Sequence, residues 1–164
     1  MFSSISRLIA VLAGIVLFGL AFTSPASAGA QEINVKATFT EPAVPSANSG
    51  CPAAPEGFCG HGQVIPFGQA ADIIEFGAGC GGTCDLRTIT LSSGTIVFDE
   101  TFSNDACPGS CHQNPAEPVS GNLTDVVVSG TGIFAAASGT LTGTVKAAGR
   151  QSQVKLSGVL TLDP

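Results

Sequence analysis

The stretch that decides the fold is Asp85–Phe102, Asp-Leu-Arg-Thr-Ile-Thr-Leu-Ser-Ser-Gly-Thr-Ile-Val-Phe-Asp-Glu-Thr-Phe. Ser93–Gly94 is typical of a two-residue hairpin loop between two short strands. That loop gathers the apolar side chains on one face, whereas a three-residue loop would turn several of them away. The two-residue loop is therefore favoured. It predicts the opposite pairs Ser92–Thr95, Leu91–Ile96, Ile89–Phe98 and Arg87–Glu100.

Alternating apolar residues predict further strands. They are expected over Gln31–Glu41, around Val126–Val128, and in a closing hairpin that turns at Gly149–Arg150 and pairs Val145 with Val154. Gln63–Phe76 is interpreted as one bent strand or two short ones, because Pro66 and Gly68 interrupt it. The total of seven or eight antiparallel strands predicts an all-β barrel, with a β-sandwich as the alternative. The segments expected to be loops are Pro42–Gly62, Gly77–Cys84 and Ser103–Pro118.

The first 28 residues have the features of a secretory signal peptide. Arg7 supplies a positive charge, Leu8–Leu20 is apolar, and Ala26-Ser27-Ala28 is a small-residue cleavage site. We therefore expect a secreted protein, extracellular or periplasmic, whose mature chain is one domain over residues 29–164. No second apolar run follows, so no membrane association is expected after cleavage.

The charge balance limits the classes of partner. Of six Lys and Arg residues, Arg7 falls in the expected signal peptide, and twelve Asp and Glu residues oppose the rest. This balance, without a cluster of basic residues in the sequence, argues against nucleic acid and anionic membranes. The absence of Trp and Tyr also argues against sugar recognition by stacking on those rings.

Six cysteines in an exported chain predict three disulfides that staple the loops. The central hairpin brings the loops holding Cys80, Cys84, Cys107 and Cys111 to one end of the fold, and the loop holding Cys51 and Cys59 is expected at the other. The favoured pairs are Cys51–Cys59, Cys80–Cys84 and Cys107–Cys111, while crossed pairs among the last four remain open. A zinc site of four thiolates beside His112 is the alternative, and an oxidising compartment argues against it. No metal or cofactor is expected, and His61 and His112 are interpreted as ordinary loop residues.

Arg87 and Glu100 are the most informative charges because they lie on an apolar face. One interpretation is a structural ion pair near a barrel mouth or a partly solvated rim. The other is a ligand cavity lined by Arg87, Ile89, Phe98 and Glu100, with Glu100 as a base or Arg87 holding a carboxylate. Asp72 and Glu75 are further candidates, on a strand whose inward face the sequence does not decide. The sequence has no Ser/His/Asp order, phosphate loop or metalloprotease helix, so a non-enzymatic role is favoured.

A second motif lies near the end of the chain. Val128-Ser129-Gly130-Thr131-Gly132-Ile133-Phe134-Ala135-Ala136-Ala137-Ser138-Gly139 resembles the Gly-x-Gly-x-Phe-x-x-Ala-x-Gly signature of the allene oxide cyclase and dirigent family, and Leu156–Leu160 is similar to its last strand. The resemblance implies an eight-stranded antiparallel barrel with an apolar cavity. The matched glycines fit turns and close backbone approaches, not catalysis. The six cysteines and the Pro-rich loop depart from the family pattern.

Three functions follow. The favoured one is a secreted barrel that binds a small apolar or amphipathic ligand or has a structural role outside the cell. The resemblance implies an alternative, a cyclase or dirigent-type enzyme that guides a reaction in the barrel cavity. A third is a surface interaction protein that uses the loops Pro42–Gly62 and Ser103–Pro118.

Overall fold

A computed structural model describes residues 29–42, 50–111 and 120–163, so the expected signal peptide lies outside the described residues. Within these residues the chain forms strands and one short 3-10 helix, η2, at Gly132–Phe134. No helix among them is long and apolar enough to cross a membrane. The strands are β1 (Gln31–Pro42), β2 (Gly57–Ile65), β3 (Gly68–Gly79), β4 (Cys84–Leu91), β5 (Gly94–Asn104), β6 (Cys107–Cys111), β7 (Ser120–Gly130), β8 (Ser138–Ala148) and β9 (Gln151–Leu162).

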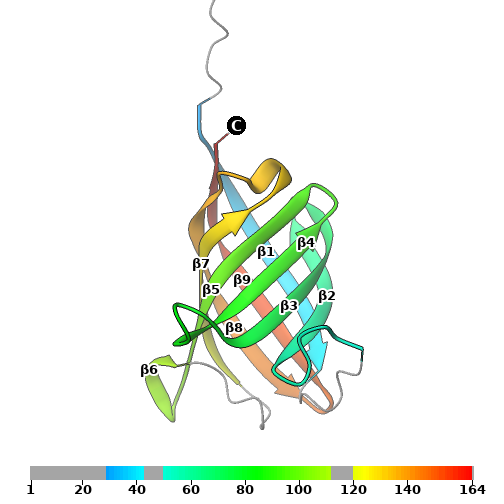
Figure 1. Ribbon diagram of the computed structural model, residues 1–164, viewed down its shortest axis with the longest axis vertical. Coiled ribbons are helices and arrows are strands. Elements are labelled where there is room, and N and C mark those ends of the chain that lie inside the picture. Colours follow the sequence, from blue (N-terminus) through cyan, green and yellow to red (C-terminus); the bar gives the residue numbers. More distant parts are fainter. Residues whose placement is uncertain (1–28, 43–49, 112–119, 164) are drawn as a thin grey trace, which may run out of the picture.

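Eight of the strands form a closed antiparallel barrel (Figure 1). Their order is β4-β3-β2-β1-β9-β8-β7-β5, and pairing of β4 with β5 closes the ring. The short strand β6 pairs with the far end of β5, where Asn104 lies opposite Cys107. The predicted barrel is confirmed, and the sandwich alternative is wrong because no free edge separates two sheets.

The central hairpin exists, but its register differs from the prediction by two residues. Leu91 lies opposite Gly94, so the loop is Ser92–Ser93 and Arg87 lies opposite Phe98 instead of Glu100. A two-residue shift preserves the alternation of faces. Arg87 and Glu100 therefore still point into the barrel, as predicted, and meet diagonally instead of directly.

The turn that contains η2 packs directly against Gly94, the first residue of β5. A side chain at Gly94 would collide with the carbonyl of Thr131, and one at Gly132 with that of Ser93. Gly132 also has a φ of 61°, which favours glycine. Gly94 comes from the predicted hairpin loop and Gly132 from the motif Val128–Gly139. Both lie where two backbone segments approach each other too closely for a side chain.

The stretch Gln63–Phe76 is two strands, joined at Pro66 and Phe67. The extra reversal moves the loop holding Cys51 to the end of the barrel that also holds Cys80 and Cys84. The prediction of opposite ends for these loops is therefore wrong. The loop predicted over Pro42–Gly62 is also shorter than expected, because β2 begins at Gly57 and places His61 within a strand.

The two ends of the barrel differ. We call the end with the β4–β5 turn the hairpin end; it also holds the β2–β3 turn and η2. The opposite end, with the β3–β4 turn at Cys80–Cys84, is the cysteine end. An apolar cluster fills the interior and includes Phe39, Ile89, Phe98, Phe134 and Leu160. The buried charges lie towards the cysteine end, beyond Phe39 along β1.

Candidate functional site

A cluster of five buried charges lies inside the barrel, one from each of five strands. It consists of Glu41 on β1, Asp72 on β3, Arg87 on β4, Glu100 on β5 and Asp125 on β7. None of these residues is more than 3% exposed. Each occupies an inward position because it continues the period of two set by buried apolar residues of its strand. We call these five residues the arginine cluster.

Arg87 is at the centre of this cluster. Its Nε donates to Oε2 of Glu100 at 2.6 Å, and its Nη1 donates to Oε1 of Glu41 at 2.9 Å and to Oδ2 of Asp72 at 2.5 Å. The Asp125 Oδ2 atom lies 3.5 Å from Nε. The guanidinium carbon is 5.9 Å from the centre of the Phe39 ring, where the charged cluster meets the apolar core.

One guanidinium does not balance four ionised carboxylates in a buried site, so protons must supply the difference. Burial, followed by repulsion from Glu41, raises the pKa of Asp72 well above its ordinary value against the attraction of Arg87. Burial and repulsion from Glu100 likewise raise the pKa of Asp125. Burial alone would lower the pKa of Arg87, but the surrounding carboxylates outweigh it and raise that pKa, so the guanidinium stays charged.

Several polar atoms of the cluster have no hydrogen-bond partner among the described residues. They are Oδ1 of Asp72, Nη2 of Arg87 and both carboxyl oxygens of Asp125. Asp125 therefore approaches Arg87 as a charge at 3.5 Å, without accepting a hydrogen bond from the guanidinium. The raised pKa values of Asp72 and Asp125 favour the protonated forms of these two carboxyl groups.

The predicted ion pair between Arg87 and Glu100 is part of this cluster. The pair is fully buried instead of lying on a solvated rim. Ile89 and Phe98 belong to the apolar cluster, and whether the four residues also line a ligand cavity stays a prediction.

Asp72 joins the cluster, whereas Glu75 is exposed on the outside of β3. Glu41 and Asp125 were missed, although both continue the inward alternation of their strands.

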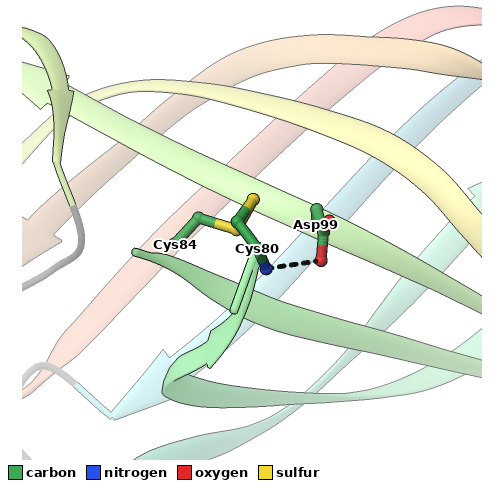
Figure 2. A group of neighbouring side chains, drawn as sticks. All are labelled: Cys80, Cys84 and Asp99. Atoms are coloured by element: carbon green, nitrogen blue, oxygen red, sulfur yellow. Dashed lines mark hydrogen bonds between the residues drawn. A yellow bond between two sulfur atoms is a disulfide. The ribbon is translucent and has the colours of Figure 1, made fainter. Parts of the chain in front are cut away.

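The cysteines confirm two of the predicted disulfides, Cys51–Cys59 and Cys80–Cys84. Cys107 is also disulfide-bonded, and the side chain of its predicted partner Cys111 lies outside the described part of the chain. Figure 2 shows Asp99 beside Cys80, whose N–H group donates to Oδ1 of Asp99 at 3.3 Å. Because the two sulfur atoms of Cys80 and Cys84 are bonded to each other, they are not thiolate ligands for zinc, and the group fastens the β3–β4 turn to β5.

An open hollow of about 440 Å³ lies at the hairpin end. Its apolar walls come from Ile33, Phe67, Ile133 and Leu162, and Gly29, Gln31 and Asp163 complete the lining. Phe67 is held in place by an edge-to-face contact with the buried Phe134, whose ring centre is 5.0 Å away. Ile133 is 50% exposed. A hollow of about 570 Å³ at the cysteine end is lined mainly by polar residues between Ser103 and Lys146.

Comparisons with known proteins add little to this geometry. No family model matches the chain, and a search of curated proteins found no match. Among solved structures, a pterocarpan synthase dirigent protein matches over 86% of this chain and 96% of that chain, with 13% sequence identity and a TM-score of 0.34. That protein belongs to the family that Val128–Gly139 resembles, but the TM-score is too low to carry an argument. The eight-stranded antiparallel barrel implied by the resemblance is confirmed by the strand order itself.

Proposed function

We propose that this protein is an exported β-barrel that binds a small apolar or amphipathic molecule in the hollow at the hairpin end. The observation that carries the proposal is the set of four apolar side chains, Ile33, Phe67, Ile133 and Leu162, around an open space of about 440 Å³. Ligand sites in proteins are concave and mainly apolar, and the mouths of β-barrels are a common place for them.

The rim of the hollow suits an amphipathic ligand. Asp163 contributes a carboxylate next to the apolar wall. If the signal peptide is removed after Ala28, Gly29 becomes the first residue and brings its α-amino group to the same rim. Two polar groups beside an apolar wall would orient a ligand that has one polar end.

Export is supported by the disulfides and by the N-terminal sequence pattern. Disulfides persist in oxidising compartments, and Cys51–Cys59 and Cys80–Cys84 both close short loops, with sequence separations of 8 and 4. N-terminal sequencing of protein secreted by its host would test this part of the proposal. A mature chain that starts at Gly29 is the expected result, and a chain that retains Met1 would contradict it.

A fluorescent probe tests the ligand site. N-phenyl-1-naphthylamine is small, apolar and uncharged, and the protein has no Trp or Tyr to interfere with its fluorescence. We expect saturable binding that the substitution Ile133→Asn weakens about fivefold, because part of the burial of an isoleucine, about 1 kcal/mol, is lost.

The matched control is Ile65→Asn, since Ile65 is 54% exposed but does not line the hollow. This control should bind the probe as the unmodified protein does. Equal weakening by both substitutions, or no saturable binding at all, would contradict the proposal.

A further inference from the structure

The barrel gathers on one face basic residues that are far apart in the sequence. Apart from the buried Arg87, the Lys and Arg side chains of the described residues are Lys36, Lys146, Arg150 and Lys155, and all four are exposed. Lys36 is on β1, Lys146 on β8 and Lys155 on β9, and Arg150 is in the turn between β8 and β9. These three strands are neighbours in the barrel wall and lie behind β3, β4 and β5 in Figure 1.

The strand register aligns the three lysines in a diagonal row. Lys155 lies opposite Thr38 on β1, and Lys36 is two residues before Thr38. On its other side Lys155 lies opposite Thr144 on β8, and Lys146 is two residues beyond. Diagonal neighbours of this kind are about 7–8 Å apart. We call Lys36, Lys155 and Lys146 the lysine row.

A shallow hollow of about 280 Å³ lies between the first two lysines of the row. Lys36 and Lys155 line it together with the hydroxyl groups of Thr38, Thr142 and Ser157. Ammonium groups and hydroxyls are all hydrogen-bond donors, so the hollow offers an anion two charges and several neutral donors.

No acidic residue lies directly opposite a lysine of the row. Glu32 is exposed on β1 four residues before Lys36, and Asp105 lines the hollow at the cysteine end together with Lys146. Each salt bridge observed among the described residues involves Arg87, and none involves a lysine. The residues opposite the lysines carry no charge; they are Thr38, Ile65, Ser120, Thr144, Gln153 and Ser157. The acidic Glu75 and Asp99 lie on β3 and β5, across the barrel. A chain with a formal net charge of −6 therefore has one face with a local excess of positive charge.

From this arrangement we infer that the β1–β9–β8 face binds an acidic polysaccharide along the lysine row. Carboxylate or sulfate groups of the polymer pair with the ammonium groups, and its sugar hydroxyls hydrogen-bond with the intervening Thr, Ser and Gln side chains. The described part of this face has no aromatic side chain on which a nucleic acid base would stack, which favours a polysaccharide over single-stranded nucleic acid. This mode of binding relies on charge and does not require the Trp or Tyr rings that the chain lacks.

Binding to immobilised polymers tests the inference and separates the two acidic groups. We expect retention on polygalacturonate, which carries carboxylates, or on heparin, which carries sulfates, and no retention on neutral dextran. Retention should fall as NaCl is raised from 50 to 300 mM, because salt screens exposed charges. The polymer retained more strongly identifies which acidic group the face prefers.

Two double variants that change the net charge equally test whether the lysine row is the binding site. Lys36→Gln with Lys155→Gln should weaken binding about 2- to 30-fold, as expected from two exposed ion contacts of about 0.2–1 kcal/mol each. Gln69→Glu with Thr90→Glu changes the net charge by the same amount on exposed positions of β3 and β4, across the barrel, and should have little effect. Equal weakening by both would show a net-charge effect and overturn the inference. Dextran binding as strong as that of the acidic polymers, or stronger retention on single-stranded DNA, would also overturn it.

Discussion

The two halves of the barrel interior follow the same alternation of strand residues but are filled with opposite chemistry. Towards the hairpin end, Leu91, Ile96 and Leu160 pack by shape and area alone. Towards the cysteine end, Arg87 is bonded to carboxyl groups from three other strands. Apolar packing has no direction and no charge, so it is insensitive to pH, whereas the arginine cluster depends on geometry and on bound protons. The comparison teaches that an inward strand position buries whichever side chain occupies it. An apolar side chain there needs only close packing, whereas a charged one also needs a counter-charge or a bound proton.

The largest expected effect is from removing the cation of the arginine cluster. Arg87→Met keeps an unbranched apolar side chain but leaves the carboxyl groups buried without a counter-charge. We expect the free energy of unfolding at pH 7.5 to fall by about 3–5 kcal/mol. Far-UV circular dichroism during urea unfolding measures it, and the loss should be smaller at pH 4.5, where more carboxyl groups are protonated. A loss that does not change with pH would contradict the account.

A cavity in the apolar half gives the contrasting result. Leu160, on β9, is 0% exposed and packs in the core opposite Ile33. Leu160→Ala should lower the free energy of unfolding by about 2–5 kcal/mol, through lost burial and the cavity that remains. Because no charge is involved, the loss should be the same at pH 4.5 and pH 7.5. A marked pH dependence here would mean that the two halves are coupled more closely than the comparison assumes.

A smaller effect is expected from the disulfide at the cysteine end. The Cys80–Cys84 bond closes a ring with a sequence separation of only 4, so it constrains little of the unfolded chain. Replacing both residues with Ala should lower the free energy of unfolding by about 2 kcal/mol. Urea unfolding of the oxidised variant checks this value, and the pH dependence of stability should remain that of the unmodified protein. A changed pH dependence would show that the bond positions the arginine cluster.

The smallest expected effect comes from the ionisation of one carboxyl group, that of Asp125. The folded-state pKa of Asp125 is raised by burial, so its stabilising contribution is complete below the unfolded pKa of about 3.9 and is lost as pH rises towards the folded value. Within that window one such proton changes the unfolding free energy by about 1.4 kcal/mol per pH unit.

Asp125→Asn mimics the protonated acid, because its amide has nearly the same shape and is uncharged at every pH. The variant should therefore gain stability relative to the unmodified protein as pH rises from 4.5 to 8. A constant difference between the two proteins across this range would show that Asp125 ionises normally.

Much of the barrel follows from local patterns in the sequence. The alternation in Gln31–Glu41, the closing hairpin at Gly149–Arg150 and the pairing of Val145 with Val154 all appear in the structure as predicted. The central loop was misplaced by one residue, because the position of Gly94 is determined by its contact with the turn at Thr131–Gly132. That contact joins segments distant in the sequence, and no local signal reveals it.

The arginine cluster was only half predictable for a similar reason. Arg87 and Glu100 are in one hairpin, so the sequence brings them together. Glu41 and Asp125 come from β1 and β7, and their approach to Arg87 depends on closure of the barrel. The lysine row shows the same principle on the outer surface: Lys36 is more than a hundred residues from Lys146 and Lys155, so the sequence contains no basic cluster, yet the strand order creates one.

The measurement that tests the proposed function most directly is a map of probe binding by methyl NMR. Protein labelled at its Ile and Leu methyl groups would be titrated with N-phenyl-1-naphthylamine. The account predicts shift changes at Ile33, Ile133 and Leu162, with the methyl groups of Ile89 unaffected. Changes centred on Ile89, next to Arg87 and Phe98 in the barrel interior, would contradict it and would place the ligand in the cavity that the sequence predicts.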